Sequence, residues 1–484
     1  MEFKHIRGSI LILFDKITEL PLLIAAAIVS IFIVKNFDPQ VVTPIFIIAL
    51  SPLGKLIQYI STFYTVADGH LIVETGLWRK KRTEIPLRQI TTVDLSQNIL
   101  YQLTKTYKIK VDNASQTIDT VDQAEIRLAL KAEKALAFKQ AIIQNNAPEI
   151  TDEDNRTVIT ASLRDFLKLG LLQSKTVYVI SGLPVAVPII TAAAVKIGGY
   201  QSTDDLFNHV FSHFLDPLAW GLGLFSFIVS FYGIALAISL LKAVITYYNY
   251  RISENREILK IEYGLLNKKK YTFHKNKISG VLFKQNLLMR LFHCYTATIM
   301  VIGYGDKSDE QALEQAIFYP IASLPKMKNI LQALLPDYIV EESLQKPTSK
   351  ARRYFFYRPG FIIAVLIFMG ALVAGSLGSI ILISVPASVL LGIAGVSVLL
   401  QYGNTGISCR DNTINLSYGG YHKTIAVIKT ARIESITALG SVLKRKKGIV
   451  SINIGITAPL REANLKVLNL PAEQYYLLAR VMKY

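Results

Sequence analysis

One stretch of this chain occurs three times, and this repeat restricts the possible folds more than any other feature of the sequence. The copies are Leu71–Ala114, Leu259–Val301 and Ile414–Ile456. In each copy a glycine precedes an isoleucine by fourteen residues, in the pairs Gly76 and Ile90, Gly264 and Ile278, and Gly419 and Ile433. Self-similarity at a fixed spacing is typical of one supersecondary unit used repeatedly. We therefore expect three related modules.

The residues within each copy have the pattern of short β-strands. Tyr107–Asp112 alternates apolar and polar residues, as a strand with one buried face does. A helix is expected after the strands, since a capping box at Asp122–Glu125 predicts a helical run to about Gln144. In the later copies, Leu324-Pro325 and Leu470-Pro471 place a proline in the first helical turn. Each module is therefore predicted to be a small β-barrel or sandwich with a C-terminal helix.

A short signature accompanies the repeat and carries a resemblance to a known family. In the first copy its residues are Ile85-Pro86, Ile90, Val93, Gln97-Asn98 and Leu100. The second copy keeps Gln285-Asn286 and Leu288, whereas the third has Gly440-Ser441 in place of the Gln-Asn pair. This pattern resembles the bacterial pleckstrin-homology-like (PH-like) domain, once catalogued as a domain of unknown function. Three such modules, each after paired hydrophobic segments, resemble the YdbT-like membrane proteins of Gram-positive bacteria.

The composition indicates a membrane protein with segregated charge. Hydrophobic residues make up 51% of the 484 residues, the mean hydropathy is +0.36, and 53 Lys and Arg against 35 Asp and Glu give a net charge of +18. Apolar segments precede each module in pairs, and about 20 apolar residues span a bilayer core. They are 20–34 and 41–64, 176–197 and 218–248, and 361–380 and 381–402. The expected fold class is mixed membrane α plus β, with six transmembrane helices in three hairpins, each followed by a cytosolic PH-like module.

This organisation divides the chain into six parts. They are hairpin 1 (1–64), PH-like module 1 (65–145), a linker, interfacial helix and hairpin 2 (146–250), module 2 (251–335), a linker and hairpin 3 (336–402), and module 3 (403–484). The interfacial helix is expected at Leu163–Ser174, an apolar stretch that contains Arg164, Asp165 and Lys168. Because nearly all Lys and Arg fall in the modules, the linkers and the N-terminus, the positive-inside rule predicts that the modules and both termini are cytoplasmic.

Basic runs within the modules are the candidate binding residues. They are Arg79, Lys80, Lys81 and Arg82, then Lys268, Lys269 and Lys270, and finally Lys444, Arg445, Lys446 and Lys447. Each Lys or Arg close to an anionic leaflet contributes about 1 kcal/mol of binding free energy. Anionic lipid headgroups are therefore the expected partners. The alternative is that the basic runs form a solvated face whose only role is to determine the membrane topology. Nucleic acid is not expected, because membrane topology accounts for the charge distribution.

A search for chemistry finds one candidate metal site and no catalytic residues. Asp205, His209 and His213 follow one another at four-residue spacing, so a helix would present a carboxylate and two imidazoles to a zinc ion on one face. The alternative is an amphipathic loop helix with incidental histidines. Cys294 and Cys409 fall in different modules and are expected to be reduced. We expect no enzyme activity and no cofactor.

The function expected from these observations is a multi-pass membrane scaffold with three cytosolic PH-like binding modules. The family resemblance implies a role in envelope stress or in resistance and immunity against cationic bacteriocins. It also implies a smaller, one-module member of the family as a partner. The alternative is a transporter or exporter with regulatory PH-like domains, for which Pro184, Pro188 and Lys242 would be the sensitive positions.

Overall fold

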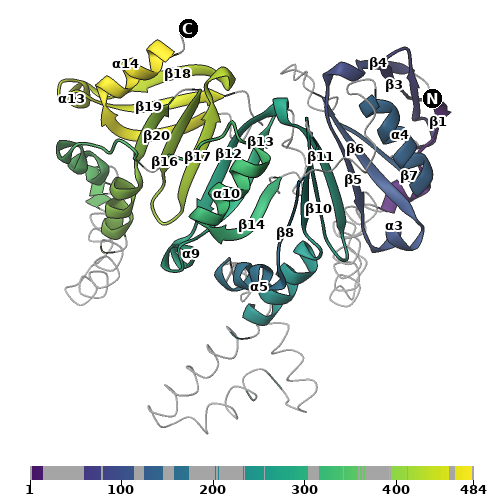
Figure 1. Ribbon diagram of the computed structural model, residues 1–484, viewed down its shortest axis with the longest axis horizontal. Coiled ribbons are helices and arrows are strands. Elements are labelled where there is room, and N and C mark those ends of the chain that lie inside the picture. Colours follow the sequence, from purple (N-terminus) through teal and green to yellow (C-terminus); the bar gives the residue numbers. More distant parts are fainter. Residues whose placement is uncertain are drawn as a thin grey trace.

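The computed structural model of the chain describes most of the three modules. The described residues are 3–14, 59–77, 80–113, 125–144, 157–173, 202, 205, 233, 235–255, 257–302, 316–341, 343–357, 360–361, 364–365, 392, 394–410, 412–456 and 464–481. Figure 1 shows the modules side by side in a row, with module 1 at the right and module 3 at the left.

Each module has the same order of elements: three strands, a 3₁₀ turn, a fourth strand, a short helix, two more strands and a closing helix. Module 1 consists of β2 (Phe63–Ala67), β3 (His70–Thr75), β4 (Lys81–Pro86), η2 (Leu87–Gln89), β5 (Ile90–Gln97), α3 (Ile99–Leu103), β6 (Thr106–Asn113), β7 (Glu125–Lys131) and α4 (Ala132–Gln144). The predicted capping box at Asp122–Glu125 is wrong, because Glu125 begins β7 and the helix starts at Ala132.

Modules 2 and 3 repeat this order. Module 2 consists of β9 (Arg251–Asn255), β10 (Ile258–Tyr263), β11 (Lys268–His274), η4 (Lys275–Lys277), β12 (Ile278–Gln285), α9 (Leu287–Leu291), β13 (Cys294–Val301), β14 (Ile317–Ser323) and α10 (Leu324–Leu334). Module 3 consists of β15 (Gly406–Arg410), β16 (Thr413–Tyr418), β17 (Lys423–Lys429), η6 (Thr430–Arg432), β18 (Ile433–Leu439), α13 (Val442–Arg445), β19 (Ile449–Ile456), β20 (Asn464–Pro471) and α14 (Ala472–Val481). The three-fold repeat is confirmed.

Further elements add to the edges of the modules. The strand β1 (Phe3–Ile6) pairs with β2 and is followed by η1 (Ile10–Phe14), while β8 (Thr157–Thr160) pairs with β9. The predicted helix at Leu163–Ser174 is present as α5 (Leu163–Leu172), with a capping box between Ser162 and Asp165. A short turn, η5 (Ser349–Ala351), leads into a helix over residues 352–357.

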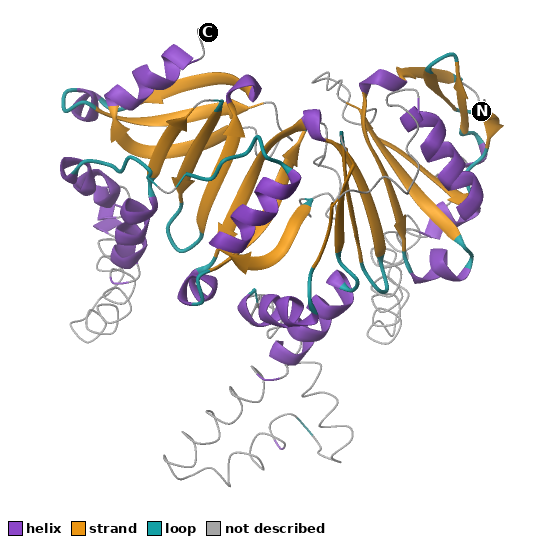
Figure 2. Cartoon of the chain, viewed as in Figure 1, coloured by secondary structure: helices purple, strands orange, loops and turns teal. Residues whose placement is uncertain are grey.

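Neighbouring modules share β-sheets instead of standing as separate barrels. A seven-stranded sheet has the order β7-β6-β5-β11-β10-β9-β8, so that β5 of module 1 pairs with β11 of module 2. A six-stranded sheet has the order β14-β13-β12-β17-β16-β15, so that β12 of module 2 pairs with β17 of module 3. We call these pairs the first and second junctions, and Figure 2 shows both sheets running through them without a break. The prediction of three separate barrels or sandwiches is therefore corrected.

The two faces of the second junction belong to different hydrophobic cores. Leu282 of β12 is 1% exposed and packs in the core of module 3, together with Leu416 and Ile452. The neighbouring Phe283 is fully buried in the core of module 2, where Val427 of module 3 joins it. Successive side chains on a strand point to opposite faces. One strand therefore stabilises two modules at once.

Glycines allow the close contacts that this architecture requires. Gly76, Gly264 and Gly419, which the repeat aligns, have φ angles of +104°, +112° and +105° at the turn before the third strand, in a region that glycine occupies without steric cost. At the second junction, a Cβ on Gly280 would lie 2.7 Å from the carbonyl oxygen of Val427. This glycine therefore lets the strands of two modules approach each other.

The expectation of six transmembrane helices is wrong for the described part of the chain, where no helix is long and apolar enough to cross a membrane. Most residues of the six predicted segments lie outside the described residues. Phe63 and Tyr64, at the end of the second predicted segment, belong to β2, and Tyr64 is buried in the core of module 1. Residues 235–247, within the fourth predicted segment, are helical.

Candidate functional site

The Gln-Asn pair of the repeat has a structural role. Asn98 and Asn286 cap α3 and α9, where their side chains accept hydrogen bonds from the backbone N–H groups of Tyr101 (2.9 Å) and Met289 (2.7 Å). The buried Gln97 donates to the carbonyl oxygen of Thr106 at 2.8 Å, and Gln285 makes the equivalent bond to Cys294 at 3.1 Å. The signature that carries the family resemblance thus fixes the turn between two strands.

In module 3, Ser441 replaces the capping asparagine. Its side chain makes no capping hydrogen bond in the structure. The short helix α13 therefore starts without the cap that α3 and α9 have.

The first two basic runs lie at corresponding places on β4 and β11, and both are engaged by carboxylates. Arg82 forms an ion pair with Glu84 at 2.8 Å, and Lys270 pairs with Glu262 at 3.4 Å. Lys269 lies 6.0 Å from the centre of the Tyr263 ring. Arg79 lies outside the described residues. Because β11 forms the first junction, its lysines belong to a sheet interior strand and not to an open loop.

The third basic run lies elsewhere in its module, on α13 and the turn after it. Arg445, Lys446 and Lys447 are exposed, whereas Lys444 is partly buried and donates a hydrogen bond to Oδ1 of Asn469 at 2.8 Å. Burial, reinforced by the charge of Lys466, lowers the pKa of Lys444. This lysine is held in place, and its three basic neighbours face solvent.

A second basic segment, which the sequence reasoning missed, lies against this run. Tyr354 is the residue that joins the two segments, because it is buried with Ala351 and Ile449 in a small cluster. Its hydroxyl donates to the carbonyl oxygen of Leu443 at 3.4 Å. Its ring has the guanidinium of Arg353 at 5.4 Å and the ammonium of Lys444 at 5.7 Å from the centroid, within the range of cation–π attraction.

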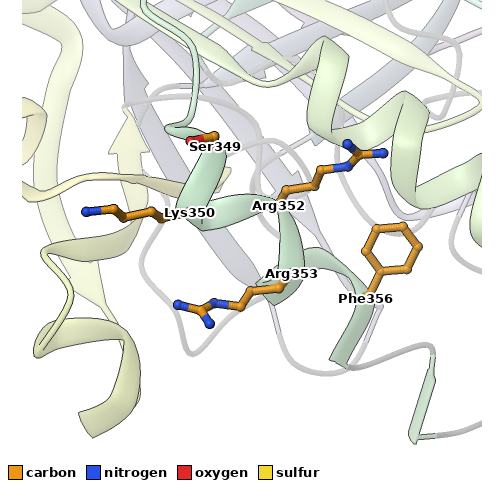
Figure 3. Close-up of a pocket in the computed structure, with 5 residues that line it drawn as sticks. All are labelled: Ser349, Lys350, Arg352, Arg353 and Phe356. Atoms are coloured by element: carbon orange, nitrogen blue, oxygen red, sulfur yellow. The ribbon is translucent and has the colours of Figure 1, made fainter.

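We call residues 349–357 and 441–448 together the Tyr354 cluster. The two segments contain seven Lys and Arg side chains and no Asp or Glu. Lys350, Arg352 and Arg353 line a shallow surface hollow of about 570 Å³ with Ser349 and Phe356. Figure 3 shows Lys350 and Arg353 extending to one side of this segment, and Arg352 and Phe356 to the other. The signal in the sequence was the run Lys350–Arg353 shortly before a long apolar segment.

Exposed apolar side chains accompany the cluster. Val442 and Leu443 of α13 are 70% and 68% exposed, and Phe356 and Tyr357 are exposed as well. The corresponding helices α3 and α9 also have exposed leucines, with Leu103 at 82% and Leu291 at 72%. Apolar residues among cations are typical of a surface that contacts lipid headgroups and the upper part of the acyl chains.

The helix α5 presents a similar outer face. Its inner face, with Phe166, Leu169 and Leu172, is buried, whereas Leu163, Leu167 and Leu171 are exposed on the outer face. Arg164 and Lys168 are exposed among these leucines. In Figure 1, α3, α5 and α9 lie along the lower side of the described part of the chain, and α13 lies at its left end.

The remaining predicted site residues are placed as follows. Of the candidate metal ligands, Asp205 is described, and His209 and His213 lie outside the described residues; within the described part no group of three ligands could hold a metal. Lys242 is exposed, and Pro184 and Pro188 also lie outside. Cys294 and Cys409 are both free thiols, and burial raises the pKa of each.

Three units of the same two-sheet fold, each closed by a helix, define a tandem array of PH-like domains, and the comparison with known families agrees. The Bacterial PH domain family matches the chain three times, at residues 18–146, 213–336 and 362–477, and the chain belongs to this family. A similar protein is the "UPF0699 transmembrane protein YdbT" of Bacillus subtilis (strain 168), which is 22% identical over 429 residues, covering 86% of this chain and 83% of the relative.

Proposed function

We propose that this chain is a membrane protein whose joined bacterial PH domains form a scaffold at the lipid surface. The Tyr354 cluster carries the proposal: its two segments contain seven cations, are joined by the anchored Tyr354, and expose Phe356, Val442 and Leu443. A phosphate-bearing surface matches this arrangement, since cations near an anionic leaflet each contribute about 1 kcal/mol and the apolar side chains enter the interface. The transmembrane relative and the apolar composition support a membrane location.

The proposal places the modules on the cytoplasmic side. The support is the uneven distribution of Lys and Arg, which favours the cytoplasm for the parts of the chain that carry them. The scaffold role involves no catalytic step, and its ligand is the lipid headgroup. A zinc site at Asp205, His209 and His213 is not part of it.

The biological setting that we propose is resistance to cationic, membrane-active peptides. A positively charged scaffold gives no electrostatic attraction for a cationic peptide, so protection acts through lipid organisation or a partner protein of the same family. A Gram-positive host with and without the gene would be compared in killing curves against a panel of such peptides and one unrelated antibiotic. Selective survival with the peptides is expected, and equal survival would reject this setting.

Lipid contact is tested separately on the full-length protein in nanodiscs. Hydrogen exchange of residues 349–357 and 441–448 would be compared between phosphatidylcholine discs and discs that also contain phosphatidylglycerol. We expect protection only with the anionic lipid. The test variant combines Arg352→Glu and Lys446→Glu, one exposed cation from each segment, so that the anchored Arg353 and Lys444 stay unchanged.

The matched control reverses the same number of charges far from the cluster. Lys131→Glu with Lys134→Glu changes two exposed lysines of module 1. The control should keep the lipid-dependent protection, and the test variant should lose it, because two reversals remove about 2 kcal/mol of attraction and add repulsion. Equal protection in the test variant and the parent protein would refute lipid contact at the Tyr354 cluster.

A further inference from the structure

The two junctions are built in the same register. At the first, Lys268 of β11 is opposite Gln97 of β5. At the second, Lys423 of β17 is opposite Gln285 of β12. Gln97 and Gln285 are aligned by the repeat, and so are Lys268 and Lys423, each of which follows its turn glycine by four residues. A module therefore joins the next one by the same strand edge, at the same offset, both times.

A second contact accompanies each junction. At the first, Nε2 of Gln102 in α3 donates to the carbonyl oxygens of Leu265 (3.1 Å) and Leu266 (2.9 Å) in the β10–β11 turn. At the second, the aligned Arg290 of α9 donates to Oδ1 of Asn404, whose Nδ2 donates to the carbonyl oxygens of Gly419 and Gly420 in the β16–β17 turn. The short helix thus holds the hairpin turn of the following module.

Module 3 has in β18 (Ile433–Leu439) the strand that corresponds to β5 and β12, the strands by which modules 1 and 2 pair with the next module. In the described part of the chain, β18 pairs with β19 alone. On the face that a following module would cover, Ser435, Thr437 and Leu439 are exposed. The aligned residues of β5, Thr92 and Asp94, are 2% and 5% exposed, because the first junction covers them.

The short helix α13 of module 3 has a hydrogen-bond donor at the position that corresponds to Gln102 of α3 and Arg290 of α9. Arg445 follows Ser441 by four residues, just as Gln102 follows Asn98 and Arg290 follows Asn286. Its side chain is exposed. The donor that would hold the hairpin turn of a following module is therefore present.

Module 1 has in β4 the strand that corresponds to β11 and β17, the strands that pair with the preceding module. Within the described residues β4 pairs only with β3, and Lys81, Arg82 and Glu84 on it are exposed. Both β4 and β11 begin with basic residues. Because β11 pairs with β5 at the first junction, these charges do not prevent the pairing of such a strand. Pro86 aligns with His274, which lies one residue beyond the last paired residue of β11, Phe273. The missing N–H of this proline would therefore fall outside the junction.

We propose that β18 of one copy of this chain pairs with β4 of a second copy, so that copies join head to tail through a third junction. The register follows from the first two junctions: Gly440 lies opposite Lys80, Leu439 opposite Lys81, and Ala438 opposite Arg82. Figure 1 places β18 and β4 at opposite ends of the row, so one chain does not close on itself. Such a head-to-tail contact is heterologous and extends into a ring or a filament. An unpaired strand edge is also a template for pairing with a second chain.

The test uses full-length protein in detergent, in a background with Cys294→Ser and Cys409→Ser. One tagged copy carries Leu439→Cys and a differently tagged copy carries Lys81→Cys. Directly opposite residues of antiparallel strands have Cα atoms about 4.5–5.5 Å apart, which allows a disulfide. We expect a cross-link between the two tags. Leu439→Cys with Glu84→Cys is the control for register and should give none.

Charge provides the reversible test. Leu439→Lys is on an exposed position, so the module should fold, but it places a lysine opposite Lys81 and should shift the mass distribution toward single chains. Mixing it with a Lys81→Glu copy should restore larger species. The proposal is overturned if the parent protein is a single chain at all concentrations without the expected cross-link. It is also overturned if β18 cross-links to a different bacterial PH domain protein instead of a second copy.

Discussion

Replacing Leu282, a residue of module 2, by alanine should destabilise module 3. Leu282 belongs to β12 of module 2, is 1% exposed, and packs in the core of module 3. Truncating a buried leucine to alanine costs about 2–5 kcal/mol. For a loss of about 3 kcal/mol, the amides of module 3 should exchange with solvent roughly a hundredfold faster, since each 1.4 kcal/mol is about a factor of ten. Hydrogen exchange with mass spectrometry would compare β16 and β19 with β10.

The control for this prediction is the adjacent residue on the same strand. Val281 is fully buried, but it faces the core of module 2. Val281→Ala should therefore accelerate exchange in β10 and leave β19 close to the parent protein. If Leu282→Ala instead acted mainly on β10, or if both variants gave the same pattern, the assignment of the two faces of β12 to two cores would be wrong.

Two further predictions concern buried polar groups. Tyr338→Phe removes the hydrogen bond from a buried hydroxyl to the carbonyl oxygen of Ile278 (2.8 Å) and should lower the thermal midpoint by the equivalent of about 1–3 kcal/mol, whereas Tyr357→Phe at an exposed position should not. Lys139 of α4 donates to Oγ1 of Thr272 across the first junction, and burial lowers its pKa to about 8. Since the unfolded chain then binds more protons between pH about 8 and about 10, stability should rise with pH over that window. Lys139→Met should remove this rise, and an unchanged pH profile would contradict the lowered pKa.

The repeat and its turns were predictable because they depend on local constraints. A turn with positive φ favours glycine, and Gly76, Gly264 and Gly419 occupy it in all three modules. The strand pattern and the closing helices followed in the same way, but two helix starts were placed too early. The start of α4 is Ala132 and not Asp122–Glu125, and Pro471 is the last residue of β20, so that α14 begins at Ala472. Asp122–Glu125 matches the short capping motif by chance, since Glu125 and the residues after it pair in a sheet.

The Tyr354 cluster was not predictable, because its halves are about ninety residues apart and their proximity depends on tertiary packing. The basic runs on β4 and β11 looked equivalent in sequence. In the structure, however, the run on β11 is part of the first junction, whereas the run on β4 pairs with β3 alone among the described strands. Two basic runs with similar local sequence therefore lie in different environments, which depend on whether the strand pairs with a neighbouring module.

The burial of β12 in two cores is visible in the sequence as an unbroken apolar run, but its meaning can be recognised only once the fold is known. A strand that covers one core alternates apolar and polar residues, whereas a strand that packs against apolar cores on both faces is apolar along its length. Ile278–Gln285 is buried along almost its entire length, and its apolar run Val281–Phe283 shows no alternation. Ile433–Leu439 alternates instead, and in this it resembles Ile90–Gln97, whose polar Thr92 and Asp94 are nonetheless buried at a junction. Alternation therefore does not mark the end of the array, because a polar strand face is compatible with a following module.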